Sequence, residues 1–273
     1  TFAEKGTELT GYDAMSYLDL RAGRMLDVHI PTDIGWMYNT MGVFSFITEF
    51  WNPLRAAGVA LQGNMSLWLG GLHPVEHELQ LLRWNDAELG GRGFVPWSAF
   101  RHPQLGSVEI GGWDKVHYWY NAPFDKLEKE VAPHADWLTY LALASPRLEV
   151  RSFTALPVGE NEWRVRLVIE NTGWLPTNGS QRALERKAVG GIVAEIALPA
   201  NARLVENSLR RDVGQLQGRS EQRSTATWWG YSPGTPDRAV VEWRVIAPAG
   251  SSVLATASHA RAGTVRTRLS LRR

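Results

Sequence analysis

The pattern of apolar and polar residues changes near the middle of the chain. In the first half, stretches with helical spacing surround one compact apolar run. We predict helices near residues 33–41, 74–88 and 121–146, since Gly42 and Gly90 stand where helices end and Pro123 where one begins. Pro133 lies inside the third stretch, and we expect it to interrupt that helix.

The compact run is VFSFITEF, residues 43–50, and Pro53 follows shortly after its end. It is rich in β-branched and aromatic residues and too short for an independent helix, which is typical of a buried strand. The Gly- and Pro-rich stretch at 94–113 predicts a loop with one short strand at 107–110. We therefore expect residues 1–146 to form an α/β segment.

Beyond residue 146, short alternating segments are separated by Gly, Pro, Asn and Ser turns. The expected strands cover residues 148–153, 163–169, 189–197, 239–246, 253–259 and 264–271. Several strands at near-regular spacing without helices are typical of an all-β sandwich. The predicted fold is therefore an α/β segment at 1–146 followed by a β-sandwich domain at 147–273.

Charge supports this boundary. Residues 1–146 hold 10 Lys and Arg against 17 Asp and Glu, a balance of −7, whereas residues 147–273 hold 19 against 11, a balance of +8. The arginines of the second half are spread thinly over the expected strands, which favours a solvated surface over a nucleic-acid interface. We expect no nucleic-acid partner.

Composition excludes some classes of site. The chain has no cysteine, so disulfides, thiolate metal sites and cysteine nucleophiles are excluded. It has no run of 18 uncharged apolar residues, and we expect no membrane partner. It opens at Thr1 without Met, which we interpret as a processed or truncated terminus, and the compartment stays open, with a secreted or periplasmic location favoured.

Glu49 is the most informative residue for chemistry. A carboxylate inside an apolar strand costs several kcal/mol unless it is paired, bound to metal or protonated. At the end of a strand in an α/β sheet, it could serve as a general base. The alternative is a buried glutamate that pairs with an arginine for structural reasons.

Three separated stretches resemble one family. The series from Ile34 through Trp36, Tyr38 and Gly42 into the run that ends at Glu49 is the first. The strings HPQLGSVEIGGW (102–113), followed by Asn121-Ala-Pro123, and ENTGWLPT (170–177) are the others. Over roughly residues 10–180, the chain resembles the carboxypeptidase A-like zinc metallopeptidases, in their bacterial branch with longer C-terminal regions.

This resemblance implies that residues 1–146 are the C-terminal part of a mixed-sheet catalytic domain and that Glu49 is the catalytic base and acid for peptide hydrolysis. It implies zinc as cofactor and a peptide as substrate. The family's ligands, His-x-x-Glu and a distant His, precede the glutamate by many tens of residues, so we expect them outside this chain, in a missing N-terminal half. Residues 26–30 offer His29 where the family has a substrate-clamping tyrosine. We expect this chain alone to be inactive.

A competing metal motif lies at His73, Glu76 and His77. It fits His-x-x-Glu-His, with two histidines four residues apart on one helix face, an arrangement that can bind zinc. Pro74 places His73 at the helix edge, so a solvent-facing helix start is the alternative. No metal ligand of this chain is therefore assigned.

The remaining candidates are weaker. We expect His102 to shape a turn and His259 to end a strand, and His117 and His134 have no ligand spacing. Glu109 could line a cleft or be a hydrogen-bonded structural carboxylate. The residues Trp228, Trp229 and Tyr231 could stack on sugar rings or pack in a core. The predicted function is thus part of a zinc metallocarboxypeptidase, and the alternative is a non-catalytic binding or scaffolding module with a Trp-rich sandwich.

Overall fold

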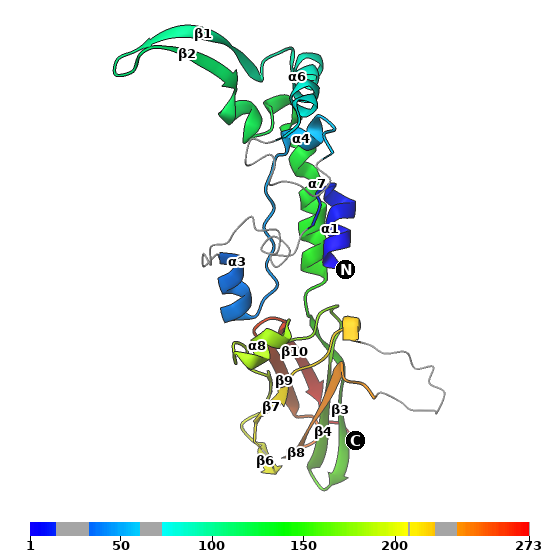
Figure 1. Ribbon diagram of the computed structural model, residues 1–273. Helices are drawn as coiled ribbons and strands as arrows, with labels where there is room; N and C mark the ends of the chain where they lie inside the picture. Colours follow the sequence, from blue (N-terminus) through cyan, green and yellow to red (C-terminus); the bar gives the residue numbers. More distant parts are fainter. Residues whose placement is uncertain (15–32, 61–72, 207, 222–233, 273) are drawn as a thin grey trace. The chain divides into compact units, whose positions relative to one another are not determined.

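The computed structural model describes residues 1–14, 33–60, 73–206, 208–221 and 234–272 (Figure 1). These residues form two units. The first comprises the described residues of 1–29 and 47–138, and the second those of 30–46 and 139–273. The helical segment before residue 46 therefore belongs with the C-terminal strands, although it lies early in the sequence. His29 and the Trp228, Trp229 and Tyr231 group lie outside the described residues.

The first unit is mainly helical. Its described helices are α1 (Phe2–Thr10), α4 (Pro53–Ala56), α6 (Val75–Leu89), the π-helix η2 (Lys115–Trp119) and most of α7 (Phe124–Leu143). The predicted helix at 74–88 is confirmed as α6, which follows Pro74 and ends at Gly90 in the left-handed conformation, with φ 57°. Only glycine adopts this conformation at no steric cost.

A small aromatic core holds this unit together. Leu54, Ala57, Val59 and Leu81 are buried, with Trp84, Trp113 and Trp119 packed against them. The ring of Trp113 stacks on buried Tyr118 at a centroid distance of 5.0 Å. Burial raises the pKa of Tyr118, and the charge of Glu78 adds to that effect. Large rings thus supply much of the buried surface in a unit with few aliphatic core residues.

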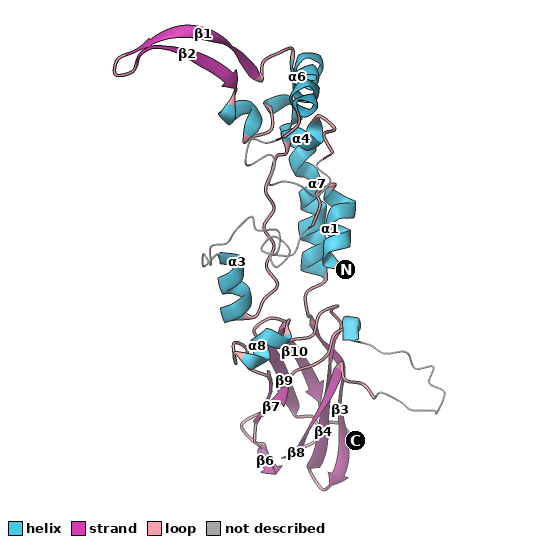
Figure 2. Ribbon diagram, in the orientation of Figure 1, coloured by secondary structure: helices cyan, strands magenta, loops and turns pink. Residues whose placement is uncertain are grey.

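The sheet of this unit is a two-stranded antiparallel hairpin of β1 (Phe94–His102) and β2 (Gly106–Trp113) (Figure 2). The sequence predicted only its second strand, because Pro96 cannot donate a ladder hydrogen bond. The pairing register shifts between Val95 and Ser98, so the strand skips the ladder at that proline. Pro133 is a second correction, since α7 continues through it.

In the second unit, two four-stranded antiparallel sheets enclose one hydrophobic core, a sandwich-like arrangement (Figure 1). In spatial order the first sheet contains β3 (Leu148–Gly159), β4 (Glu162–Asn171), β8 (Arg238–Ile246) and β6 (Arg203–Glu206). The second contains β10 (Gly263–Ser270), β9 (Ser252–His259), β5 (Ile192–Ala197) and β7 (Arg210–Gly214). The six predicted strands are confirmed as β3, β4, β5, β8, β9 and β10.

Alternation along these strands explains the core. In β4, and in β8 from Val241 onward, every second residue is buried, including Trp163 at 1% exposure and Trp243 at 0%. Both indole N–H groups find acceptors in main-chain carbonyls, Ala247 for Trp163 at 2.9 Å and Ser208 for Trp243 at 3.2 Å. These two Trp residues pack in the core of the second unit.

Short helices accompany the strands of this unit. They are α3 (Asp33–Trp36), the π-helix η1 (Met37–Met41), α8 (Gln181–Glu185) and the 3-10 helix η3 (Arg219–Glu221). The first two confirm the helix predicted at 33–41, whereas α8 corrects the prediction of strands without helices. Within the described ranges, no helix combines the length and apolar character needed to cross a bilayer.

Candidate functional site

Glu49 lies in a loop rather than in a strand. Residues 42–52, between η1 and α4, form a loop in which no strand pairing is described (Figure 2). The Glu49 side chain is exposed, and no ion-pair partner is described for it. The predictions of a buried strand at 43–50 and of a buried carboxylate are therefore wrong for these residues.

The reason lies in what a strand needs. A strand is stabilised by main-chain pairing with a neighbour and by burial of its side chains, and an apolar sequence supplies only the potential for burial. The described residues place no strand beside 43–50, and Phe46, Ile47 and Phe50 are 45%, 53% and 44% exposed. This stretch thus has the composition of a buried strand, whereas its large apolar side chains stay about half exposed.

The turn before this stretch is held by residues that sequence reasoning missed. Gly42 ends η1 with φ 62°, and its carbonyl accepts hydrogen bonds from Ser180 Oγ at 2.6 Å and from Arg261 Nη1 at 3.0 Å. Arg261 also donates through Nη2 to the carbonyl of Met41 and through Nη1 to that of Asn178. Burial lowers the pKa of the Arg261 guanidinium. Ser180 and Arg261 lie 138 and 219 residues after Gly42, so no local sequence signal could have predicted these contacts.

The residue after Glu49 belongs to a second cluster. The Phe50 ring packs edge-on against the His134 ring, with a centroid distance of 4.3 Å, and against the Tyr12 ring, with a centroid distance of 6.4 Å. Tyr12 donates a hydrogen bond to the carboxylate of Glu130, and Arg55 forms an ion pair with the same oxygen. The cluster therefore gathers side chains from the segment after α1, from α4 and from α7.

Titration in this cluster follows from burial. Burial lowers the pKa of His134, opposed by the charge of Glu130, which raises it. Burial also raises the pKa of Tyr12, and its hydrogen bond to Glu130 acts in the same direction. The His134 side chain is 5% exposed, and its Nε2 has no hydrogen-bond partner among the described residues. The cluster fixes Phe50 through packing, and His134 is a neutral ring within it at neutral pH.

The structure does not bring the competing metal motif together. His73 Nε2 lies 2.7 Å from Glu78 Oε1, and Trp113 Nε1 donates to the other oxygen of Glu78 at 3.2 Å. Glu76 faces solvent. Among the described residues, no three His, Asp or Glu side chains are grouped so as to hold a metal ion. His73 therefore serves as a partner of Glu78 at the start of α6.

The other histidines have local roles. His102 Nδ1 accepts from the N–H groups of Gln104 at 3.2 Å and Leu105 at 3.1 Å, so its prediction as a turn residue is confirmed. His259 ends β9, as predicted, and His117 pairs with Asp114 at 3.1 Å. Glu109 is exposed on β2.

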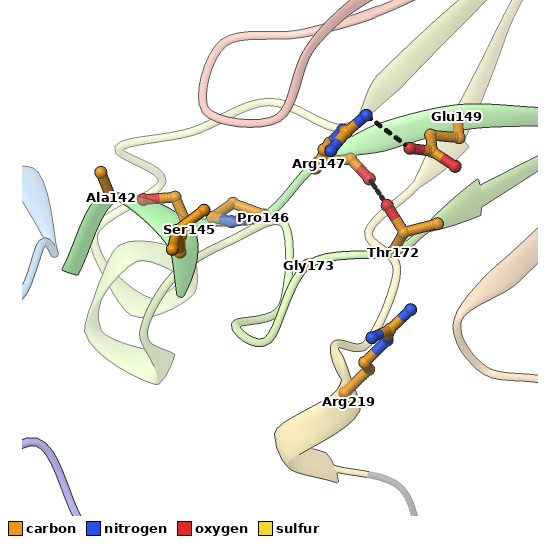
Figure 3. A pocket seen from close by; sticks show the side chains of 9 residues that line it. Ala142, Ser145, Pro146, Arg147, Glu149, Thr172, Gly173 and Arg219 are labelled. Atoms are coloured by element: carbon orange, nitrogen blue, oxygen red, sulfur yellow. Dashed lines mark hydrogen bonds and ion pairs between the residues drawn. The ribbon is translucent and has the colours of Figure 1, made fainter. Parts of the chain in front are cut away.

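A polar hollow of about 430 Å³ lies where α7 leads into β3 (Figure 3). Its lining residues are Ala142, Leu143, Ser145, Pro146, Arg147, Glu149, Thr172, Gly173 and Arg219. Arg147 Nη2 pairs with Glu149 at 2.8 Å, which satisfies much of the charge on this surface. Thr172 and Gly173 belong to the ENTGWLPT string, but none of the candidate catalytic or metal-binding residues lines the hollow.

Comparison with known proteins bears on the second unit. A family model described as a domain of unknown function, DUF8731, matches residues 147–270, which cover β3 to β10. The match includes Ser180 and Arg261. No curated protein matches the chain.

Proposed function

We propose that this chain supplies the catalytic glutamate, Glu49, of a zinc-dependent carboxypeptidase-type hydrolase whose zinc ligands lie in an N-terminal half outside this sequence. One observation carries the proposal. Phe44, Phe46, Ile47 and Phe50 form a run of large apolar side chains that are 44–53% exposed, as expected of a segment whose burial depends on a larger sheet. The resemblance in the sequence names the sheet to which it would belong, a carboxypeptidase-like mixed sheet.

The order of elements supports this assignment. A helix with Trp36 and Tyr38 leads through a glycine turn into the apolar run that ends in Thr48 and Glu49. In a complete sheet, the end of that strand would lie at the edge where α/β proteins bind ligands. Glu49 is followed by Phe50, whose ring packs against His134 and Tyr12, so the position after the carboxylate is already fixed.

The contribution of this chain would be proton transfer. Glu49 would take a proton from the attacking water as the new C–O bond forms, and would deliver it to the leaving amine as the C–N bond breaks. Zinc, as the resemblance implies, would activate that water as a Lewis acid. The described residues offer no metal site of their own, so the metal would depend on the missing half.

The test uses a protein extended upstream to include the ligand-bearing half. We expect it to release C-terminal residues from peptides, and Glu49→Gln to lower kcat by about 10²–10⁴-fold, because Gln cannot accept the proton. Since Glu49 is exposed, the Glu49→Gln variant of the 273-residue chain should keep the melting temperature of the unchanged chain.

The matched control is Glu76→Gln, which removes another exposed carboxylate of the same unit. It should leave kcat unchanged, whereas a large loss would revive the metal motif at His73, Glu76 and His77. Turnover that survives Glu49→Gln would contradict Glu49 as the catalytic base. An upstream-extended protein without peptidase activity would instead favour the alternative, a non-catalytic binding module.

A further inference from the structure

The attachment of residues 33–46 to the strands of the second unit is polar and converges on one turn. None of the residues of α3 and η1 is buried, so this segment gains little from apolar packing. Instead, Ser180 and Arg261 donate to the Gly42 carbonyl, and Arg182 Nη2 donates to Asn39 Oδ1 at 2.9 Å. Hydrogen bonds have directional preferences that apolar contacts lack, so they fix position as well as proximity.

The turn also approaches the main chain of α8 closely. A Cβ added at Gly42 would lie 2.4 Å from both Cα and N of Ala183, a distance that real side chains do not reach. Ser180, which caps α8 through the Ala183 N–H at 3.3 Å, is the same residue that donates to Gly42. One hydroxyl therefore joins the start of α8 to the turn.

We propose that the strands of the second unit act as a register anchor for residues 43–50. Arg261 is the positioning residue of this anchor, and it holds the turn at Gly42. The inference rests on the proposed function, in which residues 43–50 form a strand of a catalytic sheet. Successive side chains of a strand point to opposite faces, so a slip by one residue would turn Glu49 away from the substrate. A fixed turn at the start of the strand prevents that slip. This gives the domain of unknown function a role in catalysis.

The first experiment tests the anchor in the 273-residue chain by hydrogen exchange. The Gly42 N–H donates to Tyr38 O at 3.1 Å, and the Val43 N–H donates to Met37 O at 3.4 Å. Both amides should exchange at least about tenfold faster in Gly42→Ala and in Arg261→Gln, because the turn is released locally.

Gly90→Ala is the matched control for the glycine. Gly90 ends α6 with nearly the same backbone angles as Gly42, but nothing lies within 4 Å of a Cβ added there. Its substitution carries the same backbone strain without the clash, so exchange at Gly42 and Val43 should remain unchanged. Unchanged exchange in Gly42→Ala and Arg261→Gln as well would overturn the anchor.

The second experiment uses the upstream-extended protein and separates kcat from KM. Arg261→Gln should lower kcat by about 10²-fold with little change in KM, since a displacement of about 1 Å costs that much when the binding groups lie elsewhere. Arg261→Lys, which keeps the charge and one set of donors, should recover part of the loss. Arg238→Gln is the control, because it removes an ion pair with Glu170 in the other sheet of the same unit and should lower stability without lowering kcat.

The outcomes distinguish the two proposals. If the unchanged protein hydrolyses peptides and Arg261→Gln does so equally well, the positioning role is wrong and the proposed function stands. If the unchanged protein is inactive, the proposed function fails, and the role of Arg261 in catalysis fails as well. The exchange experiment would still decide whether the turn is anchored.

Discussion

Asn171 uses its full hydrogen-bonding capacity at the end of β4. Its Oδ1 accepts from the N–H groups of Arg147 at 2.9 Å and Gly173 at 3.1 Å. Its Nδ2 donates to the carbonyls of Leu175 at 2.9 Å and Gln217 at 3.1 Å. The side chain is 1% exposed, so it replaces water for four main-chain groups.

Replacement of Asn171 by Asp should therefore destabilise the second unit. Asp keeps the shape but has no amide to donate, and its charge would face two carbonyl oxygens. We expect a loss of about 2–4 kcal/mol in the free energy of unfolding, measured by urea denaturation.

Asn161→Asp is the control for this change. Asn161 is exposed in the β3–β4 turn with φ 56°, a conformation that Asp also tolerates. It should change stability by less than about 0.5 kcal/mol. Equal effects at the two positions would show that the hydrogen bonds of Asn171 are not the cause.

At the scale of elements, α7 shows packing that outweighs a local preference. A proline inside a helix removes one hydrogen bond and crowds the carbonyl four residues before it, which costs about 3 kcal/mol or more. The helix nevertheless continues through Pro133, with His134 and Trp137 buried on one face. Trp137 also lies within 3.4 Å of where a Cβ on Gly6 would be, so α7 packs closely on α1.

Pro133→Ala should stabilise this helix. The alanine restores an N–H that can donate to the Lys129 carbonyl, and it has the highest helix propensity. We expect the first unit to gain about 1–3 kcal/mol, with a higher melting temperature. A lower melting temperature would mean that the proline ring itself is needed for packing.

At the scale of the whole molecule, each unit contains a buried histidine whose pKa is lowered. Burial lowers the pKa of His134 in the first unit and of His259 in the second. His259 Nδ1 accepts from the Arg261 N–H at 3.1 Å, and its Nε2 lies 3.1 Å from the Gly190 carbonyl. The neutral ring with its proton on Nε2 satisfies both contacts.

Stability should therefore fall as the medium becomes acidic. A histidine with a lowered pKa binds its proton more readily in the unfolded chain, so folding is favoured above the unfolded pKa of about 6.5. As pH falls through about 6.5 toward the folded pKa, the unfolded state takes up protons first and stability is lost. We expect a lower urea midpoint at pH 5.5 than at pH 7.5.

Two variants assign the effect to its residues. His259→Asn keeps an acceptor for the Arg261 N–H but does not titrate, so the second unit should lose most of its pH dependence in this range. His134→Phe should do the same for the first. Protonation of carboxylates would act at a lower pH than that of the histidines. For Glu170, burial raises the pKa, but hydrogen bonds from Arg151 and Arg238 outweigh it and lower the pKa. An unchanged slope in both variants would contradict the assignment.

The sequence alone determined what depends on neighbours along the chain. Local geometry explains the helix at 33–41, which ends at a glycine, and α6 between Pro74 and Gly90. The alternation of side chains between two faces explains the strands from residue 148 onward. The turn role of His102 was predictable for the same reason.

Only the tertiary structure decided what depends on partners far away in the sequence. It placed the apolar run at 43–50 outside the described strands, because a strand exists only beside another strand. It carried α7 through Pro133 by burial of one face, and it joined Gly42 to Ser180 and Arg261. Glu49 as a candidate came from the sequence, whereas its exposure and the anchor of the turn before it came from contacts that no local pattern records.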